Sequence, residues 1–229
     1  MSRPSALDVV ALRAELTRRF RTTTRALRVA ERDVALLSPA NADDLISEDD
    51  YVRDERLPYW ADLWPSAQIL ANDVAIMRFR GQRVLELGCG LGVVAIGAVL
   101  AGAEVTATDY YEDALLFAQL NVAEATGQAI ATRMVDWVSM PEDLGKFDVV
   151  LASDVLYEHR YASMVAEAIA TTLVRGGEAI VADPGRIALD EFLEECSDRG
   201  LASEPDVRPY VDGEIKQTIT LHRLHWKSG

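Results

Sequence analysis

The stretch that decides the fold is residues 83–92, Arg83-Val84-Leu85-Glu86-Leu87-Gly88-Cys89-Gly90-Leu91-Gly92. Its first half is rich in branched apolar side chains and predicts a buried strand over 83–87. Three alternate glycines follow, and the apolar run over 91–101 predicts a helix. A strand, a glycine-rich turn and a helix in this order begin an α/β unit, in which ligands bind beyond the carboxyl ends of the strands.

The chain after Trp60 continues this alternation. Further strands are predicted over 104–108, 129–135, 148–153, 178–182 and 214–226. Helices are predicted over 61–78, 111–125, 161–173 and 187–199. Because strands rich in Val, Ile and Leu alternate with helices, we expect a doubly wound, mostly parallel sheet covered on both faces. The strand over 214–226 has no helix after it and is expected to be antiparallel.

The chain before residue 59 has a different pattern. Apolar side chains near helical spacing predict a short helix over 6–20. Residues 26–30 and 34–37 predict a small hairpin, and residues 41–57 form a polar, acidic loop. We therefore divide the chain into an N-terminal extension, residues 1–58, and a main domain, residues 59–229.

The composition is that of an ordinary soluble protein, with 49% apolar and 26% charged residues among 229. The longest apolar run, residues 91–103, is well short of the roughly 20 residues that span a bilayer. The first residues lack the pattern of a secretory signal. Two cysteines, Cys89 and Cys196, are too few for a disulfide framework or a metal cluster. We therefore expect a cytoplasmic protein with no membrane partner and no bound metal.

The net charge of −14 belongs almost entirely to the main domain, since residues 61–229 hold 13 basic and 26 acidic residues. Binding to nucleic-acid phosphates needs clustered Lys and Arg, so this charge argues against a nucleic-acid partner. An acidic rim would instead attract a basic segment of a substrate.

Two carboxylates accompany the glycine turn. Glu86 lies at the end of the first strand, and Asp109 ends the next strand about twenty residues on. An acid at the second position accepts hydrogen bonds from ribose hydroxyls, although Asp109 could also cap the helix that follows. The dinucleotide fingerprint places a glycine where this chain has Val93, and no Gly-Lys-Ser/Thr is present. The turn is therefore expected to bind a ligand with a ribose that is neither a dinucleotide nor a P-loop nucleotide.

This pattern, an acid, Leu-Gly-Cys-Gly-Leu-Gly and an acid after the next strand, resembles the S-adenosylmethionine (SAM) site of the seven-stranded class I methyltransferases. The resemblance covers residues 60–226 and implies a seven-stranded Rossmann-like sheet. It implies that the turn, with Gly88, Cys89 and Gly90, packs against the methionine part of SAM and that Asp109 holds the ribose. Glu86 would support the loop or meet the amino group of SAM.

Asp136 and Trp137 follow the third strand and suit an adenine, because the indole packs on the base and the acid takes the exocyclic amine. The alternative is a core tryptophan beside a surface acid.

The segment Asp148–Tyr157 ends the fourth strand and carries Asp154 and Tyr157 in an Asp-x-x-Tyr pattern. This pattern resembles the family-16 methyltransferases, most of which methylate protein lysines. Residues 58–67, Pro-Tyr-Trp-Ala-Asp-Leu-Trp-Pro-Ser-Ala, resemble the tryptophan-bearing segment of that family. The resemblance implies that Trp64 and Ser153 contact SAM and that S-adenosylhomocysteine is the product.

The resemblance implies roles for the residues at the acceptor side. Asp154 would capture and orient a substrate amine, and Tyr157 would line its channel, with Tyr59 and Trp60 as an aromatic wall. The alternatives are that Asp154 caps a helix and Tyr157 only packs. Residues 183–186, Asp-Pro-Gly-Arg, resemble the corresponding turn of one family-16 lysine methyltransferase. The alternative is that they form only a Pro-Gly turn with an Asp cap.

The expected function is methylation of a lysine side chain on a protein substrate. Methylation of a small amine or heterocycle and a non-catalytic SAM-binding partner are the alternatives. The Asn/Asp-Pro-Pro-Tyr signature of base methylation is absent, which argues against DNA or RNA as the acceptor.

Overall fold

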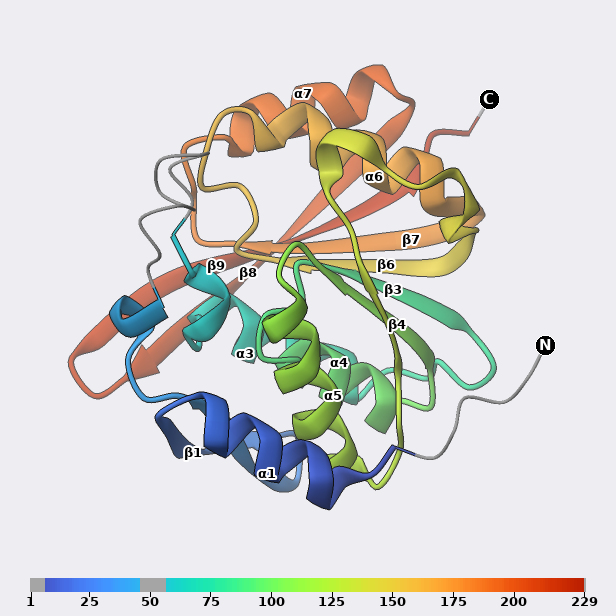
Figure 1. The fold of residues 1–229 in the computed structure, drawn as a ribbon. Helices are drawn as coiled ribbons and strands as arrows, with labels where there is room; N and C mark the ends of the chain where they lie inside the picture. The colour runs from blue at the N-terminus through green and yellow to red at the C-terminus, as the bar shows by residue number, and fades with distance from the viewer. Residues whose placement is uncertain (1–6, 46–56, 229) are drawn as a thin grey trace.

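A seven-stranded sheet forms the centre of the molecule, with helices on both faces (Figure 1). The computed structural model describes residues 7–45 and 57–228. The large sheet consists of β3 (Arg83–Leu87), β4 (Glu104–Asp109), β5 (Ala131–Met134), β6 (Phe147–Ser153), β7 (Leu173–Asp183), β8 (Leu201–Asp212) and β9 (Ile215–Trp226). The helices are α1 (Val9–Arg19), α3 (Pro65–Ala75), α4 (Val93–Leu100), α5 (Glu112–Thr126), α6 (Tyr161–Thr172) and α7 (Leu189–Asp198).

The strand order is β5-β4-β3-β6-β7-β9-β8. The first five strands in this order are parallel, whereas β9 pairs antiparallel with both β7 and β8. The expected doubly wound, mostly parallel sheet with an antiparallel strand near its end is confirmed. Since β4 and β6 flank β3 on opposite sides, the strand order reverses at β3, which is where open α/β sheets bind their ligands.

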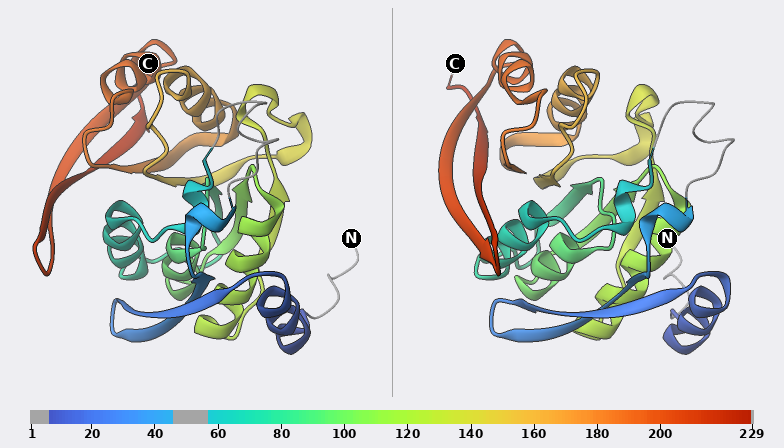
Figure 2. Two further views of the ribbon diagram at one scale, coloured as in Figure 1. Left: turned by 60° about the vertical axis from the view of Figure 1, so that its left-hand side comes forward. Right: turned by 90° about the vertical axis from the view of Figure 1, so that its left-hand side faces the viewer.

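The N-terminal helix and hairpin lie against the helices that cover one face of the sheet (Figure 2). The hairpin pairs β1 (Thr22–Val29) with β2 (Arg32–Pro39), so both strands are longer than expected. Asn121 of α5 accepts a hydrogen bond from the Leu37 amide (2.8 Å) and donates one to the Leu37 carbonyl (2.9 Å). Most of the acidic loop over 41–57 lies outside the described residues. The domain boundary at residue 58 stays a prediction.

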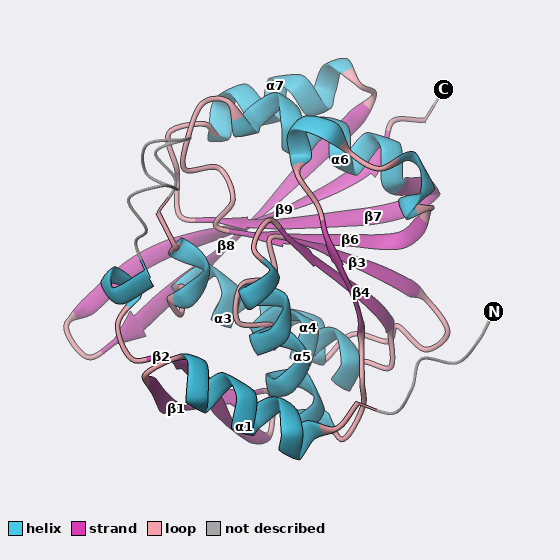
Figure 3. Cartoon of the chain, viewed as in Figure 1, coloured by secondary structure: helices cyan, strands magenta, loops and turns pink. Residues whose placement is uncertain are grey.

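Helices cover the central strands on both faces of the sheet (Figure 3). Because successive side chains point to opposite sides of a strand, both sets of side chains are buried. On β6, Val149 and Leu151 pack in the apolar cluster formed with α3, α4 and α5. Val150 and Ala152 pack in the cluster formed with α6 and α7. Such a strand needs a continuous apolar run, which is the pattern over 148–153.

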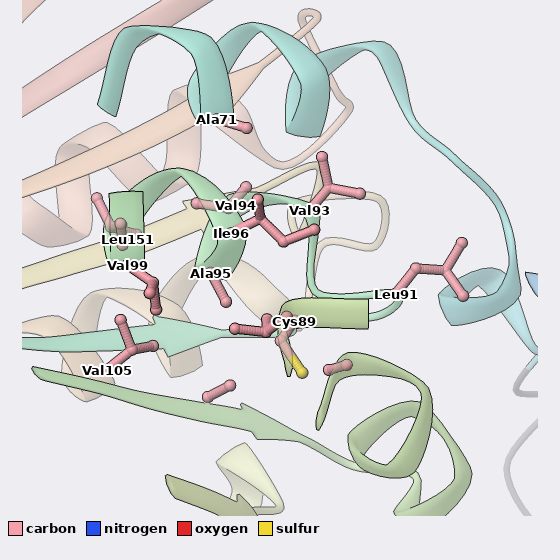
Figure 4. Packing of buried hydrophobic residues seen from close by; sticks show 14 of the residues in the cluster. Ala71, Cys89, Leu91, Val93, Val94, Ala95, Ile96, Val99, Val105 and Leu151 are labelled. Atoms are coloured by element: carbon pink, nitrogen blue, oxygen red, sulfur yellow. The ribbon is translucent and has the colours of Figure 1, made fainter. Parts of the chain in front are cut away.

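Helix α4, which follows the glycine turn, is apolar throughout and almost fully buried. Figure 4 shows its side chains in one cluster with Ala71 of α3 and Val105 of β4. This burial fixes the helix against the sheet, and with it the turn that precedes the helix. In residues 7–45 and 57–228 no helix is long and apolar enough to cross a membrane.

Strand β8 is a finding that the sequence pattern did not predict. It pairs antiparallel with β9 over its whole length and forms an edge of the sheet (Figure 2). It contains Pro205 and Pro209, which normally argue against a strand. An edge strand tolerates proline because the missing N–H can lie on the side that has no partner strand.

Candidate active site

A cleft opens at the carboxyl ends of β3, β4 and β6 and encloses about 1030 Å³, including its open mouth. Six segments line it: residues 57–67, the glycine turn with the start of α4, the loop after β4, the loop after β5, the loop after β6 and the first turn of α6. The cleft therefore lies at the point where the strand order reverses.

The structure brings almost all of the predicted site residues together in this cleft. Its lining includes Trp64, Gly88, Cys89, Gly90, Asp109, Asp136, Trp137, Ser153, Asp154 and Tyr157. Glu86 does not belong to the lining; its side chain lies behind the turn and is only 2% exposed. This arrangement favours the supporting role for Glu86 over contact with a ligand.

The glycine turn lies close to its neighbours at two positions where the backbone has a positive φ. A Cβ on Gly88 (φ 70°) would lie 3.1 Å from Val155 and 3.5 Å from the Trp137 ring, both of which line the cleft. A Cβ on Gly90 (φ 48°) would lie 3.0 Å from the Trp60 carbonyl oxygen. Glycine permits both the backbone conformation and the close approach.

Asp109 holds the loops at the centre of the cleft. Its side chain accepts hydrogen bonds from the amides of Gly90 (2.9 Å) and Tyr111 (3.1 Å). Burial raises the pKa of this carboxyl group, although these amide bonds oppose the rise. Its bond to Tyr111 closes a local turn and is not a helix cap, because α5 has Tyr111 as its N-cap and no side-chain cap bond. Asp109 also lines the cleft. Each carboxylate oxygen can accept more than one hydrogen bond, so a ligand hydroxyl can still bind.

Glu86 is a buried carboxyl group whose Oε2 has no hydrogen-bond partner in the described part of the chain. Burial raises its pKa well above the ordinary value, and the nearby charge of Asp109 raises it further. A hydrogen bond from the Ala95 amide partly opposes this shift. Ionised Glu86 is therefore a source of instability near the glycine turn.

Replacing Glu86 by Gln is expected to stabilise the ligand-free protein at pH 8. The pKa of Glu86 is higher in the folded protein than in the unfolded chain. The protein is therefore most stable below the unfolded pKa, where Glu86 is neutral, and loses stability as the pH rises through the folded pKa. We expect Glu86→Gln to raise the free energy of unfolding by about 1–3 kcal/mol at pH 8, with a smaller gain at pH 5.5. Urea unfolding at both pH values measures this difference, with the exposed Glu194→Gln on α7 as the matched control. A gain that does not change with pH would contradict this origin.

A chain of aromatic rings connects the two ends of the cleft. Tyr59 lies between Trp64 (6.1 Å between ring centroids) and Tyr157 (5.2 Å). Tyr157 contacts Tyr161 (4.9 Å), which in turn contacts Trp137 (5.5 Å). Burial, followed by the neighbouring Tyr161, strongly raises the pKa of Tyr157, so its phenol stays neutral at physiological pH.

Asp136 uses its side chain to cap a short turn, because Oδ1 accepts a hydrogen bond from the Val138 amide (3.0 Å). The adjacent Trp137 lines the cleft. Trp60, which was expected in the acceptor wall, packs its ring against Phe117 of α5 at 5.6 Å.

The loop after β6 carries Asp154 into the lining of the cleft. Asp154 has a left-handed backbone (φ 60°), and its amide donates to the Ala182 carbonyl at the end of β7 (2.9 Å). Its carboxylate is 3% exposed and accepts a hydrogen bond from Arg186 Nε at 2.5 Å. A strained backbone at a position fixed by its surroundings is common at functional sites.

Sequence reasoning missed Arg186, as well as the cleft-lining side chains of Asp62, Arg160 and Tyr161. The Arg186 guanidinium lies over the Trp64 ring, 5.2 Å from the centroid, and so connects this ring to Asp154. The signal for Arg186 was an arginine directly after a Pro-Gly turn at the same edge of the sheet as Asp154. The turn resembled one in a family-16 enzyme and also had the composition of a plain turn, and neither interpretation gave the arginine a role.

Solved structures similar in fold are Rossmann-like methyltransferases. Magnesium protoporphyrin IX methyltransferase from Synechocystis has a TM-score of 0.59 and 22% identity, covering 80% of this chain and 94% of that chain. Precorrin-6y C5,15-methyltransferase from Geobacter metallireducens has a TM-score of 0.57 and 16% identity, covering 71% of this chain and 86% of that chain. The fold is therefore that of the class I methyltransferases.

Sequence comparison identifies the family. A family model described as lysine methyltransferase matches residues 60–194, and the chain belongs to this family. The electron transfer flavoprotein beta subunit lysine methyltransferase of Danio rerio is 33% identical over 140 residues, 58% of this chain and 53% of the relative. The calmodulin-lysine N-methyltransferase of Arabidopsis thaliana is 28% identical over 151 residues, 60% of this chain and 50% of the relative. The chain thus spans about half the length of these curated relatives.

Proposed function

We propose that this protein is a SAM-dependent methyltransferase that transfers a methyl group to lysine side chains of a protein substrate. One observation carries the proposal: the cleft joins a glycine turn and the buried acid Asp109 to a second buried acid, Asp154, beside an aromatic wall. The glycine turn and Asp109 suit a nucleoside with a cationic sulfonium. Asp154 and the aromatic wall suit an amine.

The residues that line the cleft fit SAM. Its acids are Asp62, Asp109, Asp136 and Asp154, and its one basic side chain is Arg160 among the described residues. This balance favours a ligand that carries positive charge. In the proposed complex Asp109 accepts the ribose hydroxyls, and the Trp137 ring packs on adenine. The glycine turn and Trp64 contact the methionine part, and Ser153, Cys89 and Asp136 complete the lining.

Methyl transfer is a displacement in which the amine lone pair forms a bond to the methyl carbon while the carbon–sulfur bond breaks. SAM supplies the activated methyl group and leaves as S-adenosylhomocysteine. The protein must hold nitrogen, methyl and sulfur in line, and such positioning supplies much of the rate. Asp154 orients the amine and takes its proton or passes it to water. Tyr157, a neutral phenol, lines the channel and cannot act as the base.

The family relatives support a protein substrate, because their names specify lysines of the electron transfer flavoprotein beta subunit and of calmodulin. We also propose that residues 1–58 form an extension of a methyltransferase domain over 59–229, since the family match starts at residue 60. A cytoplasmic location is proposed because Cys89 and Cys196 are both free and buried.

The decisive experiment incubates the protein with methyl-labelled SAM and a cell lysate. We expect a labelled protein band, which excess unlabelled S-adenosylhomocysteine suppresses. Hydrolysis of that band should yield labelled methyl-lysine. Label only in the small-molecule fraction would instead indicate a small-amine or heterocycle acceptor. SAM binding by calorimetry without any labelling would indicate a non-catalytic partner protein.

A further inference from the structure

Arg186 is the cation that pairs with Asp154 at the acceptor side of the cleft. We propose that Arg186 is a positioning residue for methyl transfer, which holds the Asp154 carboxylate in place and neutralises it toward the incoming amine. This inference rests on the proposed function, because it concerns how the same site handles a lysine acceptor.

The turn that carries Arg186 is itself fixed. Asp183, at the end of β7, is fully buried, and its Oδ1 accepts hydrogen bonds from the amides of Gly185 and Arg186, both at 2.7 Å. Arg186 then donates from Nε to Oδ1 of Asp154 at 2.5 Å, between side chains that are 32% and 3% exposed. A continuous series of hydrogen bonds therefore runs from Asp183 at the end of β7, through Arg186, to the carboxylate of Asp154 after the neighbouring strand β6.

Three segments meet at the Arg186 side chain. The guanidinium contacts Asp154 after β6 and lies over Trp64 in the segment before α3. A planar guanidinium can bond through one edge and stack through its face at the same time. Holding these segments together fixes the acceptor side relative to the part of the cleft proposed for SAM.

The charge of Arg186 offsets an unfavourable effect of Asp154 on the lysine acceptor. The acceptor must lose its proton before it can attack, but a nearby carboxylate favours the protonated ammonium and raises the pKa of the amine. A guanidinium paired with that carboxylate cancels most of this effect. Asp154 can therefore still accept a hydrogen bond from the amine without holding it as an ammonium ion.

Asp154 shares the cleft with other titratable groups. Asp183 interacts electrostatically with Asp154. The other titratable groups that line the same cleft are Tyr59, Asp62, Cys89, Asp109, Tyr110, Tyr111, Asp136, Tyr157, Arg160 and Tyr161. Burial raises the pKa of Asp183, the proximity of Asp154 adds to this rise, and Arg186 opposes it. Arg160 pairs with Glu158 at 2.8 Å. Arg186 bonds Asp154 itself, so it neutralises the acid that is proposed to contact the acceptor amine.

The test compares Arg186→Gln with Arg186→Lys. Both variants lose the planar guanidinium, but the Lys variant keeps the positive charge and the Gln variant does not. The assay is the initial rate at which methyl-labelled SAM labels the lysate band that the wild type labels, between pH 6.5 and 10. We expect the Gln variant to be about tenfold slower at pH 7.5, with the midpoint of its rising limb about one pH unit higher. The deficit should therefore shrink at pH 10. The Lys variant should keep the wild-type midpoint and recover part of the rate.

The pH profile distinguishes this role from a merely structural one. Equal midpoints in the Gln and Lys variants, or a Gln variant as fast as the wild type, would overturn the role of Arg186. Calorimetric SAM binding shows whether each variant is folded. If the Gln variant fails to bind SAM, Arg186→Met, which keeps the apolar stem over Trp64, is tested in its place. Absence of labelling by the wild type would overturn the proposed function, and this inference with it.

Discussion

Asp154→Asn is expected to lower the rate of methyl transfer by about 100-fold or more. The amide keeps the size of the side chain but is a weaker hydrogen-bond acceptor for the amine and cannot take its proton. It also leaves the Arg186 guanidinium without the carboxylate it contacts at 2.5 Å. An uncompensated cation would then face the incoming lysine, so two losses act in the same direction. The measurement is labelling of the lysate band under single-turnover conditions.

The affinity for SAM separates this effect from misfolding. Asp154 lies at the acceptor side of the cleft, so the dissociation constant measured by calorimetry should change less than about threefold, well under 1 kcal/mol. Glu194→Gln on the exposed face of α7 removes one charge outside the cleft and should label the band like the wild type. An Asp154→Asn enzyme that retained more than a third of the wild-type rate would show that this carboxylate takes no part in the reaction.

Asp109→Ala is expected to weaken SAM binding by about 100-fold. A hydrogen bond to a charged group contributes roughly 1.5–3 kcal/mol, and two ribose hydroxyls are proposed to donate to this carboxylate. The variant also leaves the amides of Gly90 and Tyr111 without their acceptor, which loosens the glycine turn. Calorimetric titration with SAM gives the affinity. Titration with S-adenosylhomocysteine should show a similar loss, because both ligands carry the ribose.

A matched control comes from the same region of the chain. Glu112 begins α5 three residues after Asp109, is exposed and does not line the cleft. Glu112→Gln removes the same unit of charge and should leave SAM affinity within twofold of the wild type. If Asp109→Ala bound SAM as tightly as this control, the ribose assignment would be wrong, and Asp109 would only close the turn at Tyr111.

Much of the fold follows from local patterns in the sequence. The strand over 83–87 was predicted with its observed bounds, and most other strands and helices of the main domain lie within a few residues of their predicted ranges. These elements are predictable because strands buried on both faces need continuous apolar runs, whereas the helices between them need apolar residues at helical spacing. The alternation of the two then determines a parallel sheet.

The site was predictable where its residues are adjacent in sequence to the ends of strands. Parallel strands bring all their carboxyl ends to one edge, so Asp109, Trp137 and Asp154 had to come near the glycine turn. The sequence left open whether Glu86 supports the glycine turn or meets the amino group of SAM. Its side chain lies on a strand, where the choice between the cleft and the interior depends on strand twist and on the packing of α4.

Tertiary structure decided the features that join distant segments. Strand β8 contains two prolines and forms only because β9 offers a partner at the edge of the sheet. The contact of Arg186 with Asp154 joins residues 32 apart, and it exists because β6 and β7 are neighbours with both exit loops at one edge. The sequence by itself thus determined the elements, the fold class and the set of residues at the sheet edge. Only the folded chain decided which side chains pair there, because pairing depends on strand order and side-chain direction, which no local spacing encodes.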